Sequence, residues 1–195
     1  MQFVNAHTHR PTGRHIEPFG AGIHPWDADK KSVEDISAEL AKADIIGETG
    51  LDLARIASVP LQRQVEVFEQ QLQTAAKLDK PVILHCVRAF EPMMRILAHY
   101  PLRAVIFHGF TGSPQQARQA LERGYFLSFG ERTFKSPKAI EALKITPLHR
   151  LFLETDDADV EIERIYERAA EIKELSITEL QSAILENYKL IFKQI

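Results

Sequence analysis

The chain has 195 residues, of which 45% are hydrophobic and 26% charged, a balance typical of one globular domain with a sizeable core. Its net charge of −3 is not the excess of basic residues that nucleic-acid-binding proteins often have, so any anionic substrate must be bound by cationic groups at the site itself. The single cysteine, Cys86, excludes an internal disulfide. The N-terminal apolar run is too short for a signal peptide, and no stretch of about 20 apolar residues could span a membrane. We therefore expect a cytoplasmic protein.

Short apolar runs alternate with helical patterns along the chain, which is typical of β/α units around a parallel sheet. Seven strands are predicted, at Phe3–Ala6, Gly20–Ile23, Asp44–Gly47, Val82–Leu84, Ala104–Phe107, Tyr125–Phe129 and Leu151–Leu153. Five helices are predicted between them, at Ser32–Ala41, Leu61–Leu78, Glu91–His99, Pro114–Arg123 and Ser136–Leu143. Two more helices should fill the C-terminal part, with a break near Leu175–Ile177. The predicted helix caps are Ser113, Ser136 and a capping box of Ser176 with Glu179.

No linker or repeat interrupts this pattern, so we predict one domain over residues 1–195. A closed barrel of eight β/α units typically needs about 250 residues, and roughly 200 is near its lower limit. Only nine residues lie between His9 and Phe19, too few for a crossover helix and another strand. The predicted fold is therefore α/β, a TIM-like β/α barrel reduced to about seven strands, with one β/α unit missing after the first strand.

Each of several apolar runs ends in a side chain that can bind a metal. His7 and His9 end the first predicted strand, and a spacing of two places both on one face. Later runs lead into Glu48, His85, His108, Glu154 and Asp156. Because the carboxyl ends of barrel strands converge on one mouth, we expect these side chains to meet there. Any one of these histidines alone is more simply a hydrogen-bonded core or rim residue, but the set as a whole favours metal binding.

The donor types indicate the chemistry of this predicted centre. Four imidazoles and two carboxylates suit zinc, manganese or similar ions better than calcium. Two such ions can activate a bridging hydroxide and stabilise charge on both the attacking and the leaving oxygen. Cys86 alternates to the opposite face from His85, so we interpret it as a packing residue; a thiol nucleophile is the alternative.

Six ordered motifs, covering almost the whole chain, resemble those of TatD-type metal-dependent deoxyribonucleases within the larger amidohydrolase-like group. They are Asn5-Ala-His7-Thr-His9, Gly22-Ile-His24-Pro25, Ile46-Gly-Glu48-Thr-Gly50-Leu-Asp52, Pro81-Val-Ile-Leu-His85, His108-Gly-Phe-Thr-Gly112-Ser113 and Leu153-Glu-Thr-Asp156. The resemblance implies hydrolysis of phosphodiester bonds by two divalent ions, Zn, Mn or Mg. It implies as metal ligands His7, His9, Glu48, His85, His108 and Asp156. By analogy Glu48 bridges the ions, the first of which takes His7, His9 and Asp156 and the second His85 and His108.

The resemblance also assigns roles around the metals. Asp156 would orient or deprotonate the attacking water, and Glu48 is the other residue predicted to be catalytic. His24 would contact a substrate phosphate, although it could instead cap the turn beside Pro25. Arg10 and Arg88 are the other predicted substrate-binding residues. Glu154 is interpreted as structural or as support for a ligand, and Asp52 as fixing its loop.

The chain departs from the family pattern at the substrate walls. The family usually has aspartate at Asn5, histidine at Trp26 and arginine at Val87, where Arg88 is a shifted replacement. The segments before Gly22 and after Asp156 are also shorter than usual. We therefore expect a shallow, open site that another subunit could complete. Further loop cations, which could neutralise phosphate or simply form a solvated rim, are Arg14, His15, Arg132 and Lys135.

The predicted function is thus that of a TatD-type deoxyribonuclease acting on DNA or another phosphodiester. Two alternatives stay open. The first is hydrolysis of a small amide, lactone or phosphate ester, because a two-metal centre polarises carbonyl and phosphoryl oxygens alike. The second is a noncatalytic barrel used for binding. The native metal and the oligomeric state are left undetermined by the sequence.

Overall fold

The computed structural model describes residues 2–192, and the chain divides into two compact units. Unit 1 combines the N-terminal segment up to Pro18 with the segment from His108 onward. Unit 2 is the continuous segment from Phe19 to Phe107. No helix among the described residues is long and apolar enough to cross a membrane.

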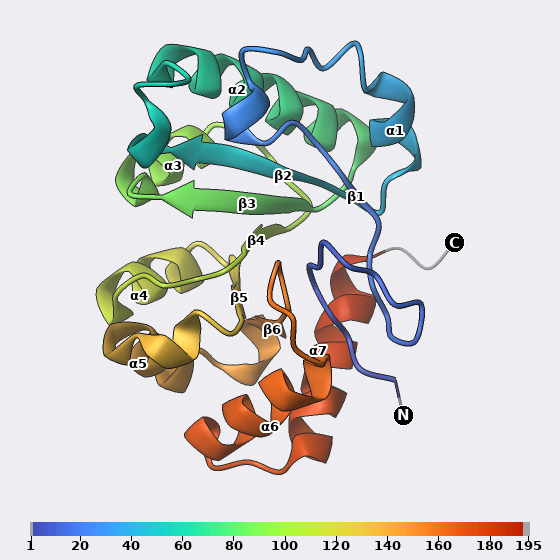
Figure 1. Ribbon diagram of the computed structural model, residues 1–195, viewed down its shortest axis with the longest axis vertical. Coiled ribbons are helices and arrows are strands. Elements are labelled where there is room, and N and C mark those ends of the chain that lie inside the picture. The colour runs from blue at the N-terminus through green and yellow to red at the C-terminus, as the bar shows by residue number, and fades with distance from the viewer. Residues whose placement is uncertain (1, 193–195) are drawn as a thin grey trace. The chain divides into compact units, whose positions relative to one another are not determined.

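Unit 2 is a parallel sheet with helices in its connections (Figure 1). Its strands are β1 (Gly20–Ala21), β2 (Ile45–Asp52), β3 (Val82–Val87) and β4 (Val105–Phe107), which pair in this order, all parallel. Its helices are α1 (Ser37–Lys42), α2 (Leu61–Leu78) and α3 (Phe90–Leu97). Helix α2 lies over β2 and buries Val67, Phe68 and Leu72, which recur at helical spacing on one face.

Unit 1 pairs two parallel strands and surrounds them with four helices. The strands are β5 (Phe126–Phe129) and β6 (Leu151–Leu153). The helices are α4 (Pro114–Glu122), α5 (Pro137–Ile145), α6 (Ile162–Lys173) and α7 (Ile177–Ile191). Helices α4 and α5 pack side by side, and α6 packs on both α5 and α7. Four short 3-10 turns complete the two units: η1 (Pro25–Asp27), η2 (Leu53–Arg55), η3 (Thr133–Lys135) and η4 (Leu148–Arg150).

The N-terminal segment belongs to unit 1 because it runs beside β6. The amide of Ala6 donates to the carbonyl of Leu153 at 3.0 Å. Farther along, the amide of His9 donates to the carbonyl of Asp156, and the amide of Asp156 donates to the carbonyl of His7. The buried hydroxyl of Tyr166 on α6 donates to the carbonyl of Val4 at 2.9 Å. These bonds fix the two histidines of this segment next to the residues that follow β6.

Most predicted elements are confirmed, some of them residue for residue. The predicted bounds of α2 and β6 are those of the structure. The capping boxes at Ser113 and Ser176 are both formed. Ser136 also stands at the N-cap of α5, as predicted, but its side chain makes no cap bond. Helix α1 begins at Ser37 because a turn closed by Ser32 and the carboxylate of Asp35 precedes it.

The predicted strand at Phe3–Ala6 is wrong, and the described residues hold six strands instead of seven. This segment forms only isolated parallel bridges, Val4 with Ile16 and Thr8 with Asp156. Residues 10–18 pair with this segment at one position only, where Ile16 bonds to Phe3 and Asn5. A single bridge is too short to make a continuous strand ladder.

Strands β2 and β3 are longer than predicted, so that Glu48 and His85 lie inside strands and not after them. The prediction ended each strand where the apolar run ends. The strands continue because their polar groups find partners: Thr49 accepts a hydrogen bond from the buried amide of Gln71, and the backbone amide of Asp52 donates to Gln64.

Candidate functional site

In unit 1, two histidines and a carboxylate converge. His7 and His9 come from the N-terminal segment, and Asp156 follows β6. Oδ1 of Asp156 lies 3.4 Å from Nε2 of His9 and 3.8 Å from Nε2 of His7. The three side chains each offer a ligand atom within 4.8 Å of the others. The ring of His108 lies 4.8 Å from that of His7, between centroids. Imidazole nitrogens and a carboxylate at these separations are a donor set for a divalent transition metal.

Asp156 is held in a backbone conformation that side chains rarely adopt. Its φ of 55° lies in the left-handed region, and the hydrogen bonds to His7 and His9 fix it there. Strain of this kind persists where the surroundings over-determine it, often at functional sites. Burial raises the pKa of the Asp156 carboxyl above its ordinary value, although His108 and His7 oppose the shift. The strained turn therefore presents a carboxylate of raised proton affinity beside the histidines.

His108 is oriented by a buried carboxylate. Glu154 is 0% exposed, and its Oε1 accepts a hydrogen bond from the amide of Gly109 at 2.6 Å and lies 3.2 Å from Nδ1 of His108. Its other oxygen accepts a hydrogen bond from the hydroxyl of Ser128 on β5. Burial alone would raise the pKa of Glu154, but the contacts with His108, His7 and Ser128 together outweigh this and lower the pKa. A carboxylate on one ring nitrogen fixes the tautomer and the direction of a ligand histidine.

Unit 2 brings together a second set, His24, Glu48 and His85, whose ligand atoms lie within 4.8 Å of one another. Oε2 of Glu48 lies 3.4 Å from Nδ1 of His85 and 3.8 Å from Nε2 of His24. The two imidazole rings are 4.3 Å apart between centroids. The sequence predicted Glu48 and His85 to be close, and within unit 2 they are.

Two glycines set the strand geometry around Glu48. The pairing of β2 with β3 shifts register between Ile46 and Thr49, so Glu48 sits at an irregularity of the ladder. A Cβ on Gly47 would lie 2.3 Å from the carbonyl oxygen of Ile83, and a Cβ on Gly50 would lie 2.2 Å from that of His85. Both glycines also have φ near 140°, so only glycine fits these positions.

His85 is also contacted by a carboxylate, Asp52, at the end of β2. Oδ2 of Asp52 lies 3.4 Å from Nε2 of His85 and accepts a hydrogen bond from the indole N–H of Trp26 at 2.7 Å. Oδ1 accepts a hydrogen bond from the amide of Ala54 and so caps η2, the loop-fixing role that the sequence indicated. Burial would raise the pKa of Asp52, but the bonds from Trp26 and Ala54 and the contact with His85 lower it.

Sequence reasoning missed the part played by Trp26, which it treated only as a departure from a pattern. The side chain is 45% exposed, and the guanidinium of Arg55 lies 4.5 Å from the ring centroid. Nothing in the local sequence pattern indicates that its N–H reaches Asp52 across 26 residues. The only feature of the sequence that could have indicated a role for Trp26 is its position two residues after His24, in the same turn.

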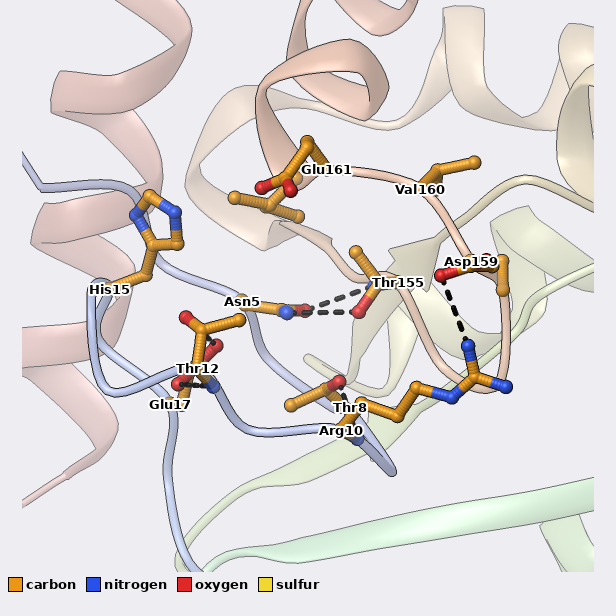
Figure 2. A pocket seen from close by; sticks show the side chains of 12 residues that line it. Asn5, Thr8, Arg10, Thr12, His15, Glu17, Thr155, Asp159, Val160 and Glu161 are labelled. Carbon is orange, nitrogen blue, oxygen red and sulfur yellow. Dashed lines mark hydrogen bonds and ion pairs between the residues drawn. The ribbon is translucent and has the colours of Figure 1, made fainter.

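The predicted substrate-binding residues lie in different settings. Nδ1 of His24 accepts a hydrogen bond from the amide of Trp26, so the ring caps η1 while its Nε2 faces Glu48. Arg10 is 64% exposed and contacts Asp159 at 3.1 Å (Figure 2). Arg88 is exposed just after β3, with a left-handed φ of 55°.

The remaining residues singled out by sequence are a set of loop cations and the cysteine. The exposed loop cations are paired with acids, Arg14 with Glu161, Arg132 with Asp157 and Lys135 with Glu131. Burial raises the pKa of the Cys86 thiol to about 12, which argues against a thiolate nucleophile.

Comparison with known proteins gives a consistent result over most of the chain. The family model described as TatD related DNase matches residues 17–193. The uncharacterized metal-dependent hydrolase YabD of Bacillus subtilis is 35% identical over 194 residues, covering 88% of this chain and 76% of that protein. The 3'-5' ssDNA/RNA exonuclease TatD of Cronobacter sakazakii is 35% identical over 146 residues, covering 70% of this chain and 55% of the exonuclease. The chain thus matches little more than half the length of the exonuclease.

Solved structures match the fold of the chain as well. The TatD homologue YjjV of Escherichia coli has a TM-score of 0.80 and 28% identity, covering 90% of this chain and 76% of that one. An uncharacterized amidohydrolase of Saccharomyces cerevisiae has a TM-score of 0.78 and 17% identity, covering 89% of this chain and 79% of that one, which shows the fold alone. These matches confirm the predicted class of fold, a β/α barrel of the TatD type.

Proposed function

The chain belongs to the family of TatD-related DNases, and from this membership we propose that it is a metal-dependent nuclease that hydrolyses phosphodiester bonds in DNA. The predicted family and the predicted class, a metal-dependent hydrolase of the TatD nuclease type, are confirmed. The observation that carries the specific proposal is the convergence of imidazoles and carboxylates in each unit, around Asp156 in unit 1 and around Glu48 in unit 2.

We propose that the metal ligands are His7, His9, Glu48, His85, His108 and Asp156, and that they hold two divalent ions, Zn, Mn or Mg. The donor chemistry fits such ions, because each unit brings imidazole nitrogens and carboxylate oxygens within 4.8 Å of one another, and these are ligand types that divalent metals use in proteins. When bound, such metals supply an activated water and positive charge for the transition state. Bridging of the two ions by Glu48 stays a prediction from the family resemblance.

The protein groups around these ligands have separable roles. Glu154 holds Nδ1 of His108, so we assign Nε2 of that ring to the metal. Asp52 holds Nε2 of His85, so we assign Nδ1, the nitrogen that faces Glu48, to the metal. Asp156, with its raised pKa, is suited to receive the proton of the attacking water.

Substrate contacts form the second part of the proposal. His24 lies against Glu48 and can donate to a phosphate oxygen, and the exposed cations Arg10 and Arg88 can neutralise neighbouring phosphates. To do so, Arg10 must break its ion pair with Asp159. Breaking this pair costs little free energy, because an exposed ion pair contributes little to stability.

The direct test is hydrolysis of end-labelled single-stranded DNA with magnesium, manganese or zinc, and with EDTA. We expect metal-dependent cleavage that Glu48→Ala abolishes, because this change removes the carboxylate between His24 and His85. The matched control is Glu66→Ala, which removes an exposed carboxylate of α2 in the same unit. Cleavage by the Glu48→Ala protein at the wild-type rate would contradict the proposal.

A folded protein that binds metal and cleaves no nucleic acid under any of these metals would favour the first alternative, a small-molecule hydrolase. Turnover on phosphate monoesters, amides and lactones then identifies the class. Metal binding without turnover on any substrate would favour the noncatalytic alternative.

We also propose that residues 1–195 form a single domain of this type and act in the cytoplasm. Support for the single domain is the family match over residues 17–193, and the cytoplasmic location rests on the lone cysteine. Completion of the site by another subunit stays a prediction. A strictly monomeric protein with full activity would contradict it.

A further inference from the structure

The segment between His9 and Phe19 carries a histidine that the proposed nuclease chemistry does not use. The side chain of His15 is only 10% exposed. Neither of its ring nitrogens makes a hydrogen bond to any described residue. Buried side-chain nitrogens are nearly always hydrogen-bonded, because leaving them without a partner costs the desolvation of the polar group. The position of this imidazole therefore calls for an additional ligand.

Two carboxylates at the start of α6 face this imidazole. Oε1 of Glu163 lies 3.4 Å from Nε2 of His15, and the other oxygen of Glu163 is buried and also makes no hydrogen bond. Glu161, the residue just before α6, contributes a further carboxylate. One nitrogen of His15 and one oxygen from each glutamate all lie within 4.8 Å of one another.

A cavity of about 220 Å³ adjoins this cluster (Figure 2). His15 and Glu161 both line it, and Figure 2 shows the imidazole of His15 turned toward the carboxylate of Glu161. The rest of the wall is largely polar and includes Thr8, Thr12 and Glu17. A polar space of this size holds several water molecules, which can complete the coordination shell of an ion.

We propose that His15, Glu161 and Glu163 bind a divalent transition-metal cation, such as Zn²⁺ or Mn²⁺, at a site that shares no residue with the proposed nuclease ligands. One imidazole nitrogen, two carboxylate oxygens and water from the cavity are an accepted ligand set for such ions. The exposed guanidinium of Arg14 contacts Glu161 and offsets one of the two carboxylate charges, and a divalent cation would offset the rest.

The site would link two segments that are far apart in the sequence. His15 belongs to the short segment that stands where a β/α unit is missing, and the two glutamates belong to the entry of α6. A metal held by both joins this loop to the start of α6 within unit 1, and its binding free energy adds to the stability of the folded state. The proposed role is therefore structural and independent of phosphodiester hydrolysis.

The test is the number of zinc or manganese ions bound per chain, measured by equilibrium dialysis and elemental analysis of the whole protein. We expect the wild-type protein to bind one equivalent more than either His15→Gln or Glu163→Gln. Glu167→Gln is the matched control, because it removes an exposed carboxylate of the same helix that pairs with Arg164. The zinc-induced rise in the thermal midpoint should shrink in the two site variants and stay unchanged in the control.

An alternative explanation is an ion pair of protonated His15 with Glu163, without a metal. In that case both site variants bind as many equivalents as the wild-type protein, and the proposal is overturned. Using two substitutions keeps the test decisive, because Glu163 is partly exposed and its replacement by glutamine preserves shape. Nuclease activity serves as a separate readout, since it should persist in both site variants whether or not the third metal is present.

Discussion

Each of the two units supports a candidate metal-binding histidine with a carboxylate, but the two carboxylates are held differently. In unit 1, Glu154 is bound by a backbone amide and by the hydroxyl of Ser128, which is buried on a core strand. In unit 2, Asp52 is bound by the amide of its own turn and by the indole of the half-exposed Trp26.

This difference separates two tasks that a supporting carboxylate can perform. Glu154 is itself fully buried and satisfies the buried hydroxyl of Ser128, so its removal should damage the fold as well as the direction of His108. Asp52 satisfies a donor that water can replace, so its removal should chiefly alter the direction and basicity of His85. The comparison predicts that stability will depend most on the support in unit 1, and metal affinity can be tuned through the support in unit 2.

The largest effect is expected for Glu154→Leu, which leaves the buried hydroxyl of Ser128 and the partly buried amide of Gly109 without an acceptor. We expect the free energy of unfolding in urea to fall by about 3–5 kcal/mol, as when one partner of a buried pair is removed. Glu141→Leu, at an exposed position on α5, is the control. A loss below about 1 kcal/mol would show that Glu154 is not essential to the packing of unit 1.

The corresponding change in unit 2, Asp52→Asn, should act on metal affinity more than on stability. Asparagine keeps an acceptor for the amide of Ala54 but removes the negative charge beside His85. Loss of such a supporting carboxylate typically weakens metal binding by about 10–100-fold. Competition with a chromophoric chelator measures the affinity, and an unfolding curve measures the stability. Unchanged affinity would exclude His85 as a ligand that Asp52 supports.

Removing one hydrogen-bond donor from each supporting carboxylate, Ser128 from Glu154 and Trp26 from Asp52, compares the two supports directly. Ser128→Ala removes one donor to the buried Glu154, and a hydrogen bond to a charged group is worth about 1.5–3 kcal/mol. We expect a loss of stability near the lower end of that range, because two other donors stay in place. Thermal or urea unfolding of the metal-free protein gives the value, and no measurable loss would mean that the hydroxyl bond is dispensable.

The smallest effect is expected for the other member of this pair, Trp26→Phe. The change removes the indole donor to Asp52 but keeps an aromatic ring near Arg55. This bond also ends on a charged group, but Trp26 is half-exposed and water can replace the indole donor, so we expect a loss of about 1 kcal/mol, which corresponds to roughly fivefold weaker metal binding if it acts wholly through His85. Global stability should change little. A variant that unfolds instead would place Trp26 among the residues that hold unit 2 together.

The sequence singled out the histidines and the two carboxylates beside them, but not the side chains that hold those carboxylates in place. His85 and His108 follow apolar runs, and such runs mark strands because buried parallel strands are nearly continuously hydrophobic. Ser128 and Trp26 reach their carboxylates from other elements, and spacing within one element carries no information about such tertiary pairs. The strand expected at Phe3–Ala6 failed for a related reason, since strand pairing depends on the partner, and segment 10–18 supplies only one pairing position.

The glycines that flank Glu48 limit how this protein could be redesigned. A saturation library over β2 should return glycine alone at Gly47 and Gly50, because any Cβ there would overlap the backbone of β3. Freedom to change the chemistry of unit 2 therefore lies in the side chains around Glu48, such as His24 and Trp26, and not in the path of the strand that carries it. An engineer who wants a new substrate for this scaffold should vary the turn at η1 and leave the strand untouched.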